Sequence, residues 1–145
     1  MRTGTLFLIP VPLGATSPAA ILPLTVCDHA AALDYFVAEN AKSARAFLKA
    51  LPCNSPLQEI TIAELNEHTP AAAVPALLDP LLAGHHVGLV SEAGCPAVAD
   101  PGARLVALAH DAGIRVVPLI GPSSILLALM GSGLSGQSFS FHGYL

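Results

Sequence analysis

Short apolar runs alternate along this chain with segments that have helical spacing or helix-capping residues. The apolar runs are bounded by Gly, Pro, Asn or Asp, a pattern that is typical of strands. The predicted strands cover residues 5–9, 33–38, 59–65, 87–91, 114–119 and 139–144. When strands and helices alternate, right-handed crossovers join strands that run parallel. The sequence therefore predicts an α/β fold, with a mainly parallel sheet of about five strands and helices on both faces.

Capping signals and apolar spacing place helices between these strands. A Ser, Thr or Asp followed by Pro is typical of a helix N-terminus, because the side chain accepts an amide hydrogen bond there and Pro needs none. Ser17, Thr69 and Asp100 are each followed by Pro, and Gly113 is placed to end a helix. The predicted helices cover residues 19–26, 40–51, 70–83, 101–112 and 122–130.

The composition limits the classes of protein to which this chain can belong. Its 145 residues are the length of one domain. Hydrophobic residues make up 53% of it and charged residues only 11%, which predicts that some apolar surface faces a partner or another domain. The net charge is −4, with six Lys and Arg in total and no basic stripe. This charge argues against nucleic-acid binding by the chain alone.

Cysteine and histidine spacing gives no sign of a disulfide framework or a metal site. Cys27, Cys53 and Cys95 are odd in number and lack Cys-x-x-Cys spacing, which favours a reducing compartment, and we expect a cytoplasmic protein. His85 and His86 are neighbours on the way into a strand, so their side chains point to opposite faces and form a poor chelating pair. We therefore expect no metal.

Two long uncharged stretches, residues 3–27 and 116–141, superficially resemble a signal peptide and a membrane span. Pro and Gly residues interrupt both of them, and no continuous apolar helix of about 20 residues fits. We interpret both stretches as buried strand–loop–helix units and expect no targeting or transmembrane segment.

Loops rich in Pro and Gly follow the predicted strands that end at Ile9, Val90 and Leu119. If these strands are neighbours, the three loops gather on one edge of the sheet. Ligands of open α/β sheets bind at that carboxyl edge. The loop at residues 91–102 consists mainly of small residues, which let a ligand approach the backbone. The sequence therefore predicts a ligand site at this edge.

Two motifs have structural explanations that compete with functional ones. Residues 131–136 match G-x-G-x-x-G by letter, yet they follow a helix and precede a strand, so a helix C-terminus and turn is the better interpretation. Ser123 and Ser124 lack the Gly spacing of a nucleophile elbow. They are placed either to cap the next helix or to donate hydrogen bonds to a ligand, and the sequence leaves both open.

The loop at residues 91–102 also contains three reactive side chains. Cys95 has no cation or base beside it in the sequence, so we interpret it as a packing or ligand-facing thiol rather than a nucleophile. Glu92 is either a base or ligand contact or a solvated loop carboxylate. Asp100 is expected to cap the helix that follows it.

Three segments in order, residues 4–14, 90–102 and 113–124, together resemble the tetrapyrrole (corrin/porphyrin) methylase superfamily of S-adenosylmethionine-dependent enzymes. The nearest branch resembles the one that methylates ribose 2′-oxygens of small-subunit ribosomal RNA. The resemblance spans residues 1–145 and implies the fold of the N-terminal domain of this superfamily. It also implies S-adenosylmethionine as the cofactor.

The resemblance further implies where ligands bind. The implied cofactor positions are Leu13, Gly94, Cys95, Val98, Ser123 and Ser124. The residues expected to line a substrate cleft are Pro10, Pro12, Ser91 and Glu92. Backbone groups and small side chains suit the methionine and adenosine parts of the cofactor, and a helix N-terminus favours its carboxylate. No catalytic base can be named from the sequence.

The chain departs from the superfamily pattern at two places. Cys95 stands where many relatives have Asp or Thr, and residues 39–42 read Glu-Asn-Ala-Lys where the ribosomal RNA branch usually has Glu-Asp-Thr-Arg. The methyl acceptor therefore stays open among a tetrapyrrole, an RNA ribose and another small molecule. Members of the superfamily continue into a second α/β domain, and their cofactor lies between the two domains. We expect the C-terminal domain to be absent from this chain, and the isolated domain to be inactive.

Two other functions compete with a methyltransferase. The high apolar content also suits a non-catalytic dimerisation or assembly domain with a vestigial ligand site. A homodimer is expected under either interpretation. A phosphate or dinucleotide binder rests only on the misplaced glycine pattern at residues 131–136.

Overall fold

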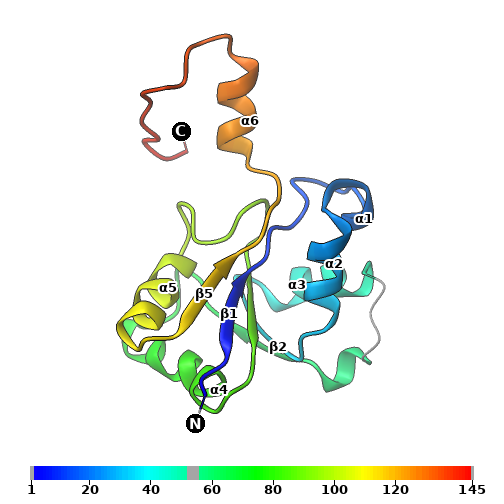
Figure 1. Ribbon diagram of the computed structural model, residues 1–145, viewed down its shortest axis with the longest axis vertical. Coiled ribbons are helices and arrows are strands. Elements are labelled where there is room, and N and C mark those ends of the chain that lie inside the picture. The colour runs from blue at the N-terminus through cyan, green and yellow to red at the C-terminus, as the bar shows by residue number, and fades with distance from the viewer. Residues whose placement is uncertain (1, 52–55, 145) are drawn as a thin grey trace.

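Five parallel strands form one sheet at the centre of the molecule (Figure 1). The computed structural model describes residues 2–51 and 56–144. The strands are β1 (Thr5–Leu8), β2 (Tyr35–Ala38), β3 (Thr61–Glu64), β4 (Val87–Val90) and β5 (Arg115–Pro118). Their order across the sheet is β3-β2-β4-β1-β5, and every pairing is parallel. The predicted α/β fold is confirmed.

Helices cover both faces of the sheet, as predicted. The helices are α1 (Pro18–Ile21), α2 (Leu24–Ala31), α3 (Ala41–Lys49), α4 (Asp79–Leu82), α5 (Gly102–Asp111) and α6 (Ser124–Gly131). Short 3₁₀ turns supplement them at η1 (Leu57–Glu59), η2 (Ala71–Ala73) and η3 (Pro75–Leu78). In Figure 1, α2 and α3 lie on one side of the sheet, whereas α4 and α5 lie on the other.

Each face of the sheet has its own hydrophobic core. Phe36 of β2 packs with Phe47 and Leu48 of α3 in one cluster, which also contains α2 residues. The next residue along the strand, Val37, belongs to the opposite cluster together with Leu105 of α5. Successive strand side chains point to opposite faces, so a strand buried on both sides is apolar throughout, and all four residues of β4 are buried.

Prolines divide two of the predicted helices. The helix predicted over 19–26 is two helices, because Pro23 stands at the N-cap of α2 and ends α1 before it. The helix predicted over 70–83 is wrong as a single element. Pro75 and Pro80 lie inside it, and it consists of two 3₁₀ turns followed by the short helix α4. Proline lacks the amide proton that an uninterrupted α-helix needs at such positions.

The predicted caps have mixed outcomes. Ser17 occupies the N-cap position of α1 but forms no side-chain capping hydrogen bond. Thr69 does not cap the following turn, since its Oγ1 accepts a hydrogen bond from the Asn66 amide at 3.0 Å. Gly113 follows α5 with φ of +69°, so the predicted helix end is confirmed there.

The strand predicted over residues 139–144 is wrong. None of these residues is in a strand, and Phe139 is 52% exposed. After α6 the chain turns back toward the body (Figure 1), and Tyr144 lines a cavity with Glu39, but none of these residues pairs with a strand of the sheet. The turn predicted for residues 131–136 is confirmed, because α6 ends at Gly131 and both Gly133 and Gly136 have positive φ.

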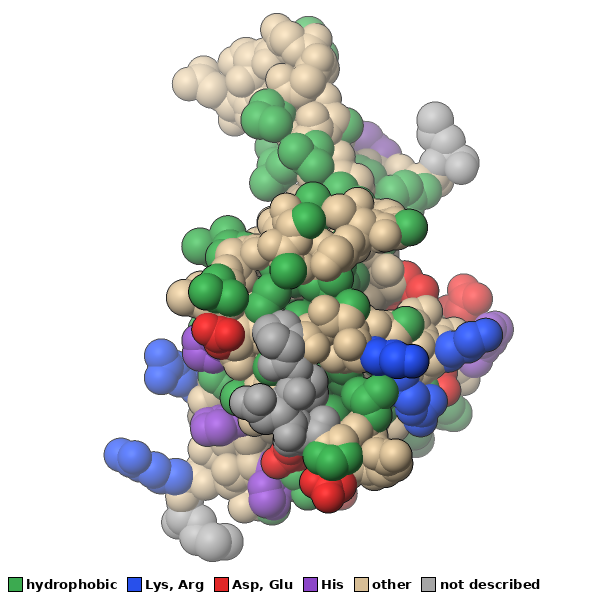
Figure 2. Space-filling model, turned by 90° about the vertical axis from the view of Figure 1, so that its right-hand side faces the viewer, with side chains coloured by type: hydrophobic (Ala, Val, Ile, Leu, Met, Phe, Trp, Pro, Cys, Tyr) green, Lys and Arg blue, Asp and Glu red, His purple; other side chains and the backbone are tan. Residues whose placement is uncertain are grey.

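Residues 124–144 form an apolar arm that stands off the sheet. Helix α6 has the sequence SILLALMG and no buried residue, and Met130 and Leu134 are about three-quarters exposed, at 75% and 76%. In Figure 2 the charged side chains lie on the body of the molecule and none is seen on the arm. The expected exposed apolar surface is therefore present. Every helix within the described residues falls short of the length and apolar character that a membrane crossing demands.

Candidate functional site

Three loops meet at the carboxyl edge of the sheet, where β4, β1 and β5 are neighbours. The loops after β1 and β4 are joined by two hydrogen bonds of 3.1 Å, in which the amides of Val11 and Gly94 each donate to the carbonyl oxygen of the other. The loop after β5 lies against them, since a Cβ on Gly121 would overlap the Pro10 ring. The predicted gathering of the three loops is confirmed.

The turn at Gly94 has a backbone that favours glycine. Its φ is +69°, and a Cβ there would lie 3.0 Å from Leu13 Cδ2 and 3.1 Å from the Pro122 carbonyl oxygen. Ala97 and Ala99 also have positive φ, of 64° and 54°. Non-glycine residues in this conformation are strained, and such strain clusters at functional sites. The loop after β4 is thus held in a conformation that its sequence alone does not favour.

A cavity of about 200 Å³ opens beside this turn, and we name it the Gly94 cavity. Five of the six predicted cofactor positions line it, namely Gly94, Cys95, Val98, Ser123 and Ser124. The other residues around it include Glu39, Glu92, Asp100 and Tyr144. The sixth, Leu13, lies beside the turn with its Cδ2 near Gly94. Residues from three loops that are distant in the sequence therefore surround one space.

The polar side chains of the Gly94 cavity have defined partners. Ser123 occupies the N-cap of α6, and its Oγ accepts a hydrogen bond from the Leu126 amide at 3.4 Å, so it caps the helix. Cys95 Sγ lies 3.3 Å from the Pro122 carbonyl oxygen, in hydrogen-bond contact with the loop after β5. Burial raises the pKa of the Cys95 thiol, which keeps it neutral. Cys27 is buried, and Cys53 lies outside the described residues.

Asp100 fixes the end of the loop. Its Oδ1 accepts hydrogen bonds from the amides of Gly102, the first residue of α5, at 2.8 Å and of Ala97 at 3.0 Å. The expectation that Asp100 caps this helix is wrong in position, because Pro101 is the N-cap of α5 and Asp100 precedes it; the Asp100 side chain nevertheless bonds the first helical amide. Burial raises the pKa of the Asp100 carboxyl, and the two backbone hydrogen bonds oppose that shift.

Glu39 is a site residue that the sequence analysis missed. It directly follows β2, and its Oε2 accepts a hydrogen bond from the Glu92 amide at 3.1 Å. Burial raises the pKa of Glu39, the hydrogen bond from Glu92 opposes the shift, and the negative charges of Asp100, Glu92 and Glu67 add to it. Its position after a strand, at the carboxyl edge, is the sequence signal that could have identified it.

Replacing Glu39 with Gln is expected to stabilise the fold at neutral pH. Because the folded-state pKa of Glu39 is raised, its stabilising contribution is fully present below the ordinary value of 4.5 and is lost as pH rises through the raised value. The expected gain at pH 7 is less than about 1 kcal/mol, since solvent screens a half-buried side chain. Urea unfolding at pH 4 and pH 7 measures it. The measured quantity is the change in the free energy of unfolding between pH 4 and pH 7. If this change is the same in the variant as in the parent chain, the prediction is contradicted.

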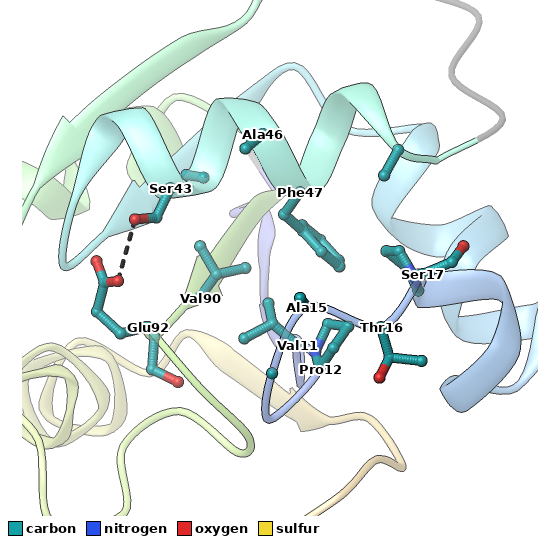
Figure 3. A pocket seen from close by; sticks show the side chains of 15 residues that line it. Val11, Pro12, Ala15, Thr16, Ser17, Ser43, Ala46, Phe47, Val90 and Glu92 are labelled. Carbon is teal, nitrogen blue, oxygen red and sulfur yellow. Dashed lines mark hydrogen bonds between the residues drawn. The ribbon is translucent and has the colours of Figure 1, made fainter.

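A second cavity, of about 300 Å³, lies between α3 and the loop after β1, and we name it the α3 cavity (Figure 3). Three of the four residues predicted for the substrate cleft line it, namely Pro12, Ser91 and Glu92. The fourth, Pro10, is buried beneath the loops and lines a different cavity with Cys95. Ser91 and Glu92 border both the α3 cavity and the Gly94 cavity, so the two spaces adjoin.

The histidine pair has structural contacts. The Thr5 amide donates a hydrogen bond of 2.9 Å to Nδ1 of His86, and the ring of His85 lies 4.8 Å from that of Tyr35. Within residues 2–51 and 56–144, no group of three or more His, Cys, Asp or Glu side chains is placed to hold a metal ion.

Comparison with known proteins identifies relatives over nearly the whole chain, although no family model matches it. Ribosomal RNA small subunit methyltransferase I of Mesorhizobium japonicum is 39% identical over 140 residues, which are 97% of this chain and 45% of that protein. The protein of the same name from Vibrio cholerae is 35% identical over 97% of this chain and 46% of its own length. That from Mycobacterium tuberculosis is 39% identical over 99% of this chain and 48% of its own length.

The chain spans about half the length of the curated relatives that it matches. All three carry the name of one branch, the branch that residues 4–14, 90–102 and 113–124 resemble. The resemblance is confirmed: over nearly its whole length the chain is homologous to the ribosomal RNA small subunit methyltransferase I proteins of the tetrapyrrole methylase family.

Proposed function

We propose that this chain forms part of an S-adenosylmethionine-dependent methyltransferase that acts on small-subunit ribosomal RNA. The observation that supports the proposal most directly is the Gly94 cavity, where the implied cofactor positions from the loops after β4 and β5 line one space. The names of the homologous proteins supply the acceptor class. The proposed localisation is the cytoplasm, and the proposed assembly state is a homodimer, for which the exposed apolar arm offers a surface.

The residues around the Gly94 cavity fit this cofactor chemically. The Gly94 turn has no Cβ, so a ligand can approach its backbone closely. The Glu39 and Asp100 carboxylates line the same cavity, and negative charge suits a sulfonium cation. The N-terminus of α6 lies at Ser123 and Ser124 and favours a carboxylate. Bound S-adenosylmethionine supplies an already activated methyl group.

The chain's own contribution is then to hold the cofactor and to orient it toward the methyl acceptor. The hydrogen bonds between Val11 and Gly94 fix the loop after β1 against the loop after β4. Asp100 anchors the other end of the β4 loop to α5. Orientation of two reactants can supply up to about 7–11 kcal/mol of barrier reduction. A rigid frame of this kind is what methyl transfer from an activated donor requires of the protein.

The proposed organisation is a single domain over residues 1–145, corresponding to the N-terminal domain of the tetrapyrrole methylases. Because the relatives are about twice as long, the proposal assigns the opposite wall of the cofactor site to the other half of their length. The apolar arm supports this arrangement, since α6 has no buried residue of its own. The small number of Lys and Arg residues, six in all, also indicates that further RNA contacts come from elsewhere.

Titration with S-adenosylhomocysteine, followed by amide NMR, tests the cofactor assignment. We expect saturable shifts at Gly94, Cys95 and Ser124, because these residues line the Gly94 cavity. Because the proposal places the opposite wall of the site in the other half of the relatives' length, the deciding titration uses a protein that includes both halves. If such a protein is well folded and its Gly94, Cys95 and Ser124 signals do not respond to the compound, the proposal is overturned.

A non-catalytic assembly domain is the second candidate function, and the apolar arm is the observation that favours it. Light scattering distinguishes the two candidates when it is combined with the same titration. A stable dimer without any cofactor response supports assembly, whereas a cofactor response supports the methyltransferase.

A further inference from the structure

Three carboxylates line the Gly94 cavity, namely those of Glu39, Glu92 and Asp100. No Lys, Arg or His from the part of the chain that the structure describes lines it. Methylation of a hydroxyl oxygen needs a proton acceptor, because the oxygen loses its proton when it gains the methyl group. A carboxylate is therefore the available base in this cavity, and the hydrogen bonds of the three carboxylates distinguish them.

Asp100 and Glu92 already serve other partners. Asp100 Oδ1 accepts hydrogen bonds from the amides of Gly102 at 2.8 Å and Ala97 at 3.0 Å, and Oδ2 also lies 3.0 Å from the Ala97 amide. Protonation of Asp100 would weaken the bonds that hold the start of α5. Glu92 is exposed, and its Oε2 accepts a hydrogen bond of 3.0 Å from Ser43 Oγ, which directs this carboxyl toward α3 (Figure 3). Neither is therefore placed as the proton acceptor of this cavity.

Glu39 has one carboxyl oxygen that is bonded and one that is open. Its Oε2 accepts the 3.1 Å hydrogen bond from the Glu92 amide, which fixes the carboxyl beside the loop after β4. Its backbone is also held, because Asn66 Nδ2 donates a hydrogen bond of 3.4 Å to the Glu39 carbonyl oxygen. Among the described residues, no group donates a hydrogen bond to Oε1 of Glu39. A half-buried carboxylate in a fixed position with one open oxygen is what a proton acceptor requires.

The surroundings of Glu39 increase its affinity for a proton. Burial raises the pKa of Glu39, the hydrogen bond from Glu92 opposes the shift, and the negative charges of Asp100 and Glu92 add to it. A base whose pKa lies closer to the working pH is more effective in proton transfer. A sulfonium cation in the same cavity favours the ionised form of Glu39, and this attraction ends when the sulfur becomes neutral. The carboxylate is thus ready to accept a proton at the moment when the methyl group leaves the sulfur.

We propose that Oε1 of Glu39 accepts the proton of the acceptor hydroxyl during methyl transfer. This inference rests on the proposed function, with a hydroxyl oxygen as the acceptor, and adds to it the base that the sequence alone could not name. The acceptor oxygen bonds to the methyl carbon as the bond from that carbon to sulfur breaks, and the electron pair of the broken bond stays on sulfur. The hydroxyl proton passes to Glu39 and then to water. The positive charge on sulfur and the negative charge on Glu39 therefore disappear together.

The Glu39→Gln variant separates proton acceptance from a structural role, because Gln can accept the Glu92 amide hydrogen bond but cannot take a proton. The assay uses a protein that includes both halves of the relatives' length and measures methyl transfer from S-adenosylmethionine to small-subunit ribosomal RNA. We expect kcat to fall by about 100-fold or more. The increase of the parent's rate with pH, as Glu39 ionises, is expected to disappear in the variant. Calorimetry is expected to give an affinity for S-adenosylhomocysteine within about fivefold of the parent's.

Glu64→Gln is the matched control. Glu64 is the last residue of β3, in register with Ala38 on the neighbouring strand, so it also lies at the carboxyl edge of the sheet. It is exposed and does not line the Gly94 cavity. We expect this variant to keep the kcat and the pH dependence of the parent.

Titration of the Glu39 carboxyl, followed by NMR of its carboxyl carbon, tests the inference without turnover. S-adenosylmethionine and S-adenosylhomocysteine differ only by the methyl group and its positive charge. We expect Glu39 to bind its proton at least about threefold more weakly with S-adenosylmethionine than with S-adenosylhomocysteine, because the cation favours the ionised carboxyl. Glu64 is expected to titrate alike with both compounds.

Several outcomes would overturn the inference. These are a Glu39→Gln variant that transfers methyl groups as fast as the parent, a loss of rate that an equal loss of S-adenosylhomocysteine affinity explains, and a Glu39 carboxyl that titrates alike with both compounds. When the parent itself transfers methyl groups, each of these results refutes the base assignment alone. A folded parent that neither binds S-adenosylhomocysteine nor transfers a methyl group refutes the proposed function, and the inference with it.

Discussion

The Gly94→Ala variant is expected to lose at least about tenfold in affinity for S-adenosylhomocysteine, whereas Gly113→Ala keeps the affinity of the parent chain. Both glycines have φ of +69°, so the added methyl group introduces a similar backbone strain, about 1–2 kcal/mol, at each position. The surroundings differ. A Cβ on Gly94 meets Leu13 Cδ2 at 3.0 Å and the Pro122 carbonyl oxygen at 3.1 Å, but a Cβ on Gly113 has no atom within 4 Å.

The contacts of the added methyl group with Leu13 and Pro122 are the reason why Gly94→Ala, unlike Gly113→Ala, is expected to weaken cofactor binding. To accept the methyl group, the loop after β4 must move away from the loops after β1 and β5, and the Gly94 cavity lies among these loops. Thermal unfolding of both variants measures how much the added methyl group destabilises each fold. The NMR titration measures their affinities for S-adenosylhomocysteine. Equal losses of affinity in the two variants would show that strain alone is responsible and that the Gly94 turn is not part of the site.

The Leu105→Ala variant is expected to be destabilised by about 2–5 kcal/mol. Leu105 on α5 is fully buried, and it packs with Leu6 of β1 and Val87 of β4 in the core of one face. For a domain near 150 residues, each kcal/mol lowers the melting temperature by about 2–4 °C. The expected decrease is therefore about 4–20 °C.

Leu126→Ala is the matched control for Leu105→Ala. Leu126 is also a helical leucine, in the first turn of α6, but it is 56% exposed and α6 has no buried residue. Its substitution is expected to change the free energy of unfolding by no more than about 0.5 kcal/mol. Urea denaturation of the two variants measures both values. A loss at Leu126 as large as that at Leu105 would mean that the arm contributes to the stability of the chain, contrary to its exposure.

The sheet and its carboxyl-edge site could be predicted because both depend on patterns that are local in the sequence. Apolar runs with Pro- and Gly-rich ends identify parallel strands and the loops after them. Once β4, β1 and β5 are neighbours, the loops after them have to meet. The predicted helix over 70–83 failed because two internal prolines outweigh helical composition. The strand predicted over 139–144 failed because the segment pairs with neither edge strand of the sheet, and strand propensity alone does not form a strand.

The parts of the site that escaped prediction depend on contacts between distant residues. Ser43 and Glu92 are 49 positions apart, and Glu39 and the Glu92 amide are 53 apart. Neither pair forms a motif, and nothing in the sequence around Glu39 indicates that its carboxyl is half-buried. The division of the site into a Gly94 cavity and an α3 cavity follows from the packing of α3 against the loop after β1, which no residue pattern encodes.

The strand order has a consequence for how this chain folds. β1 is the first strand in the sequence, yet its two partners are β4 and β5, and the Thr5 amide bonds a histidine ring 81 positions away. Both pairings of β1 therefore join segments that are far apart in the sequence, and each closes a long loop of chain. Such a non-local topology folds slowly, because the entropy of closing long loops is lost before the contacts form. The carboxyl-edge site is built from the loops after β1, β4 and β5, so it exists only where both pairings of β1 have formed.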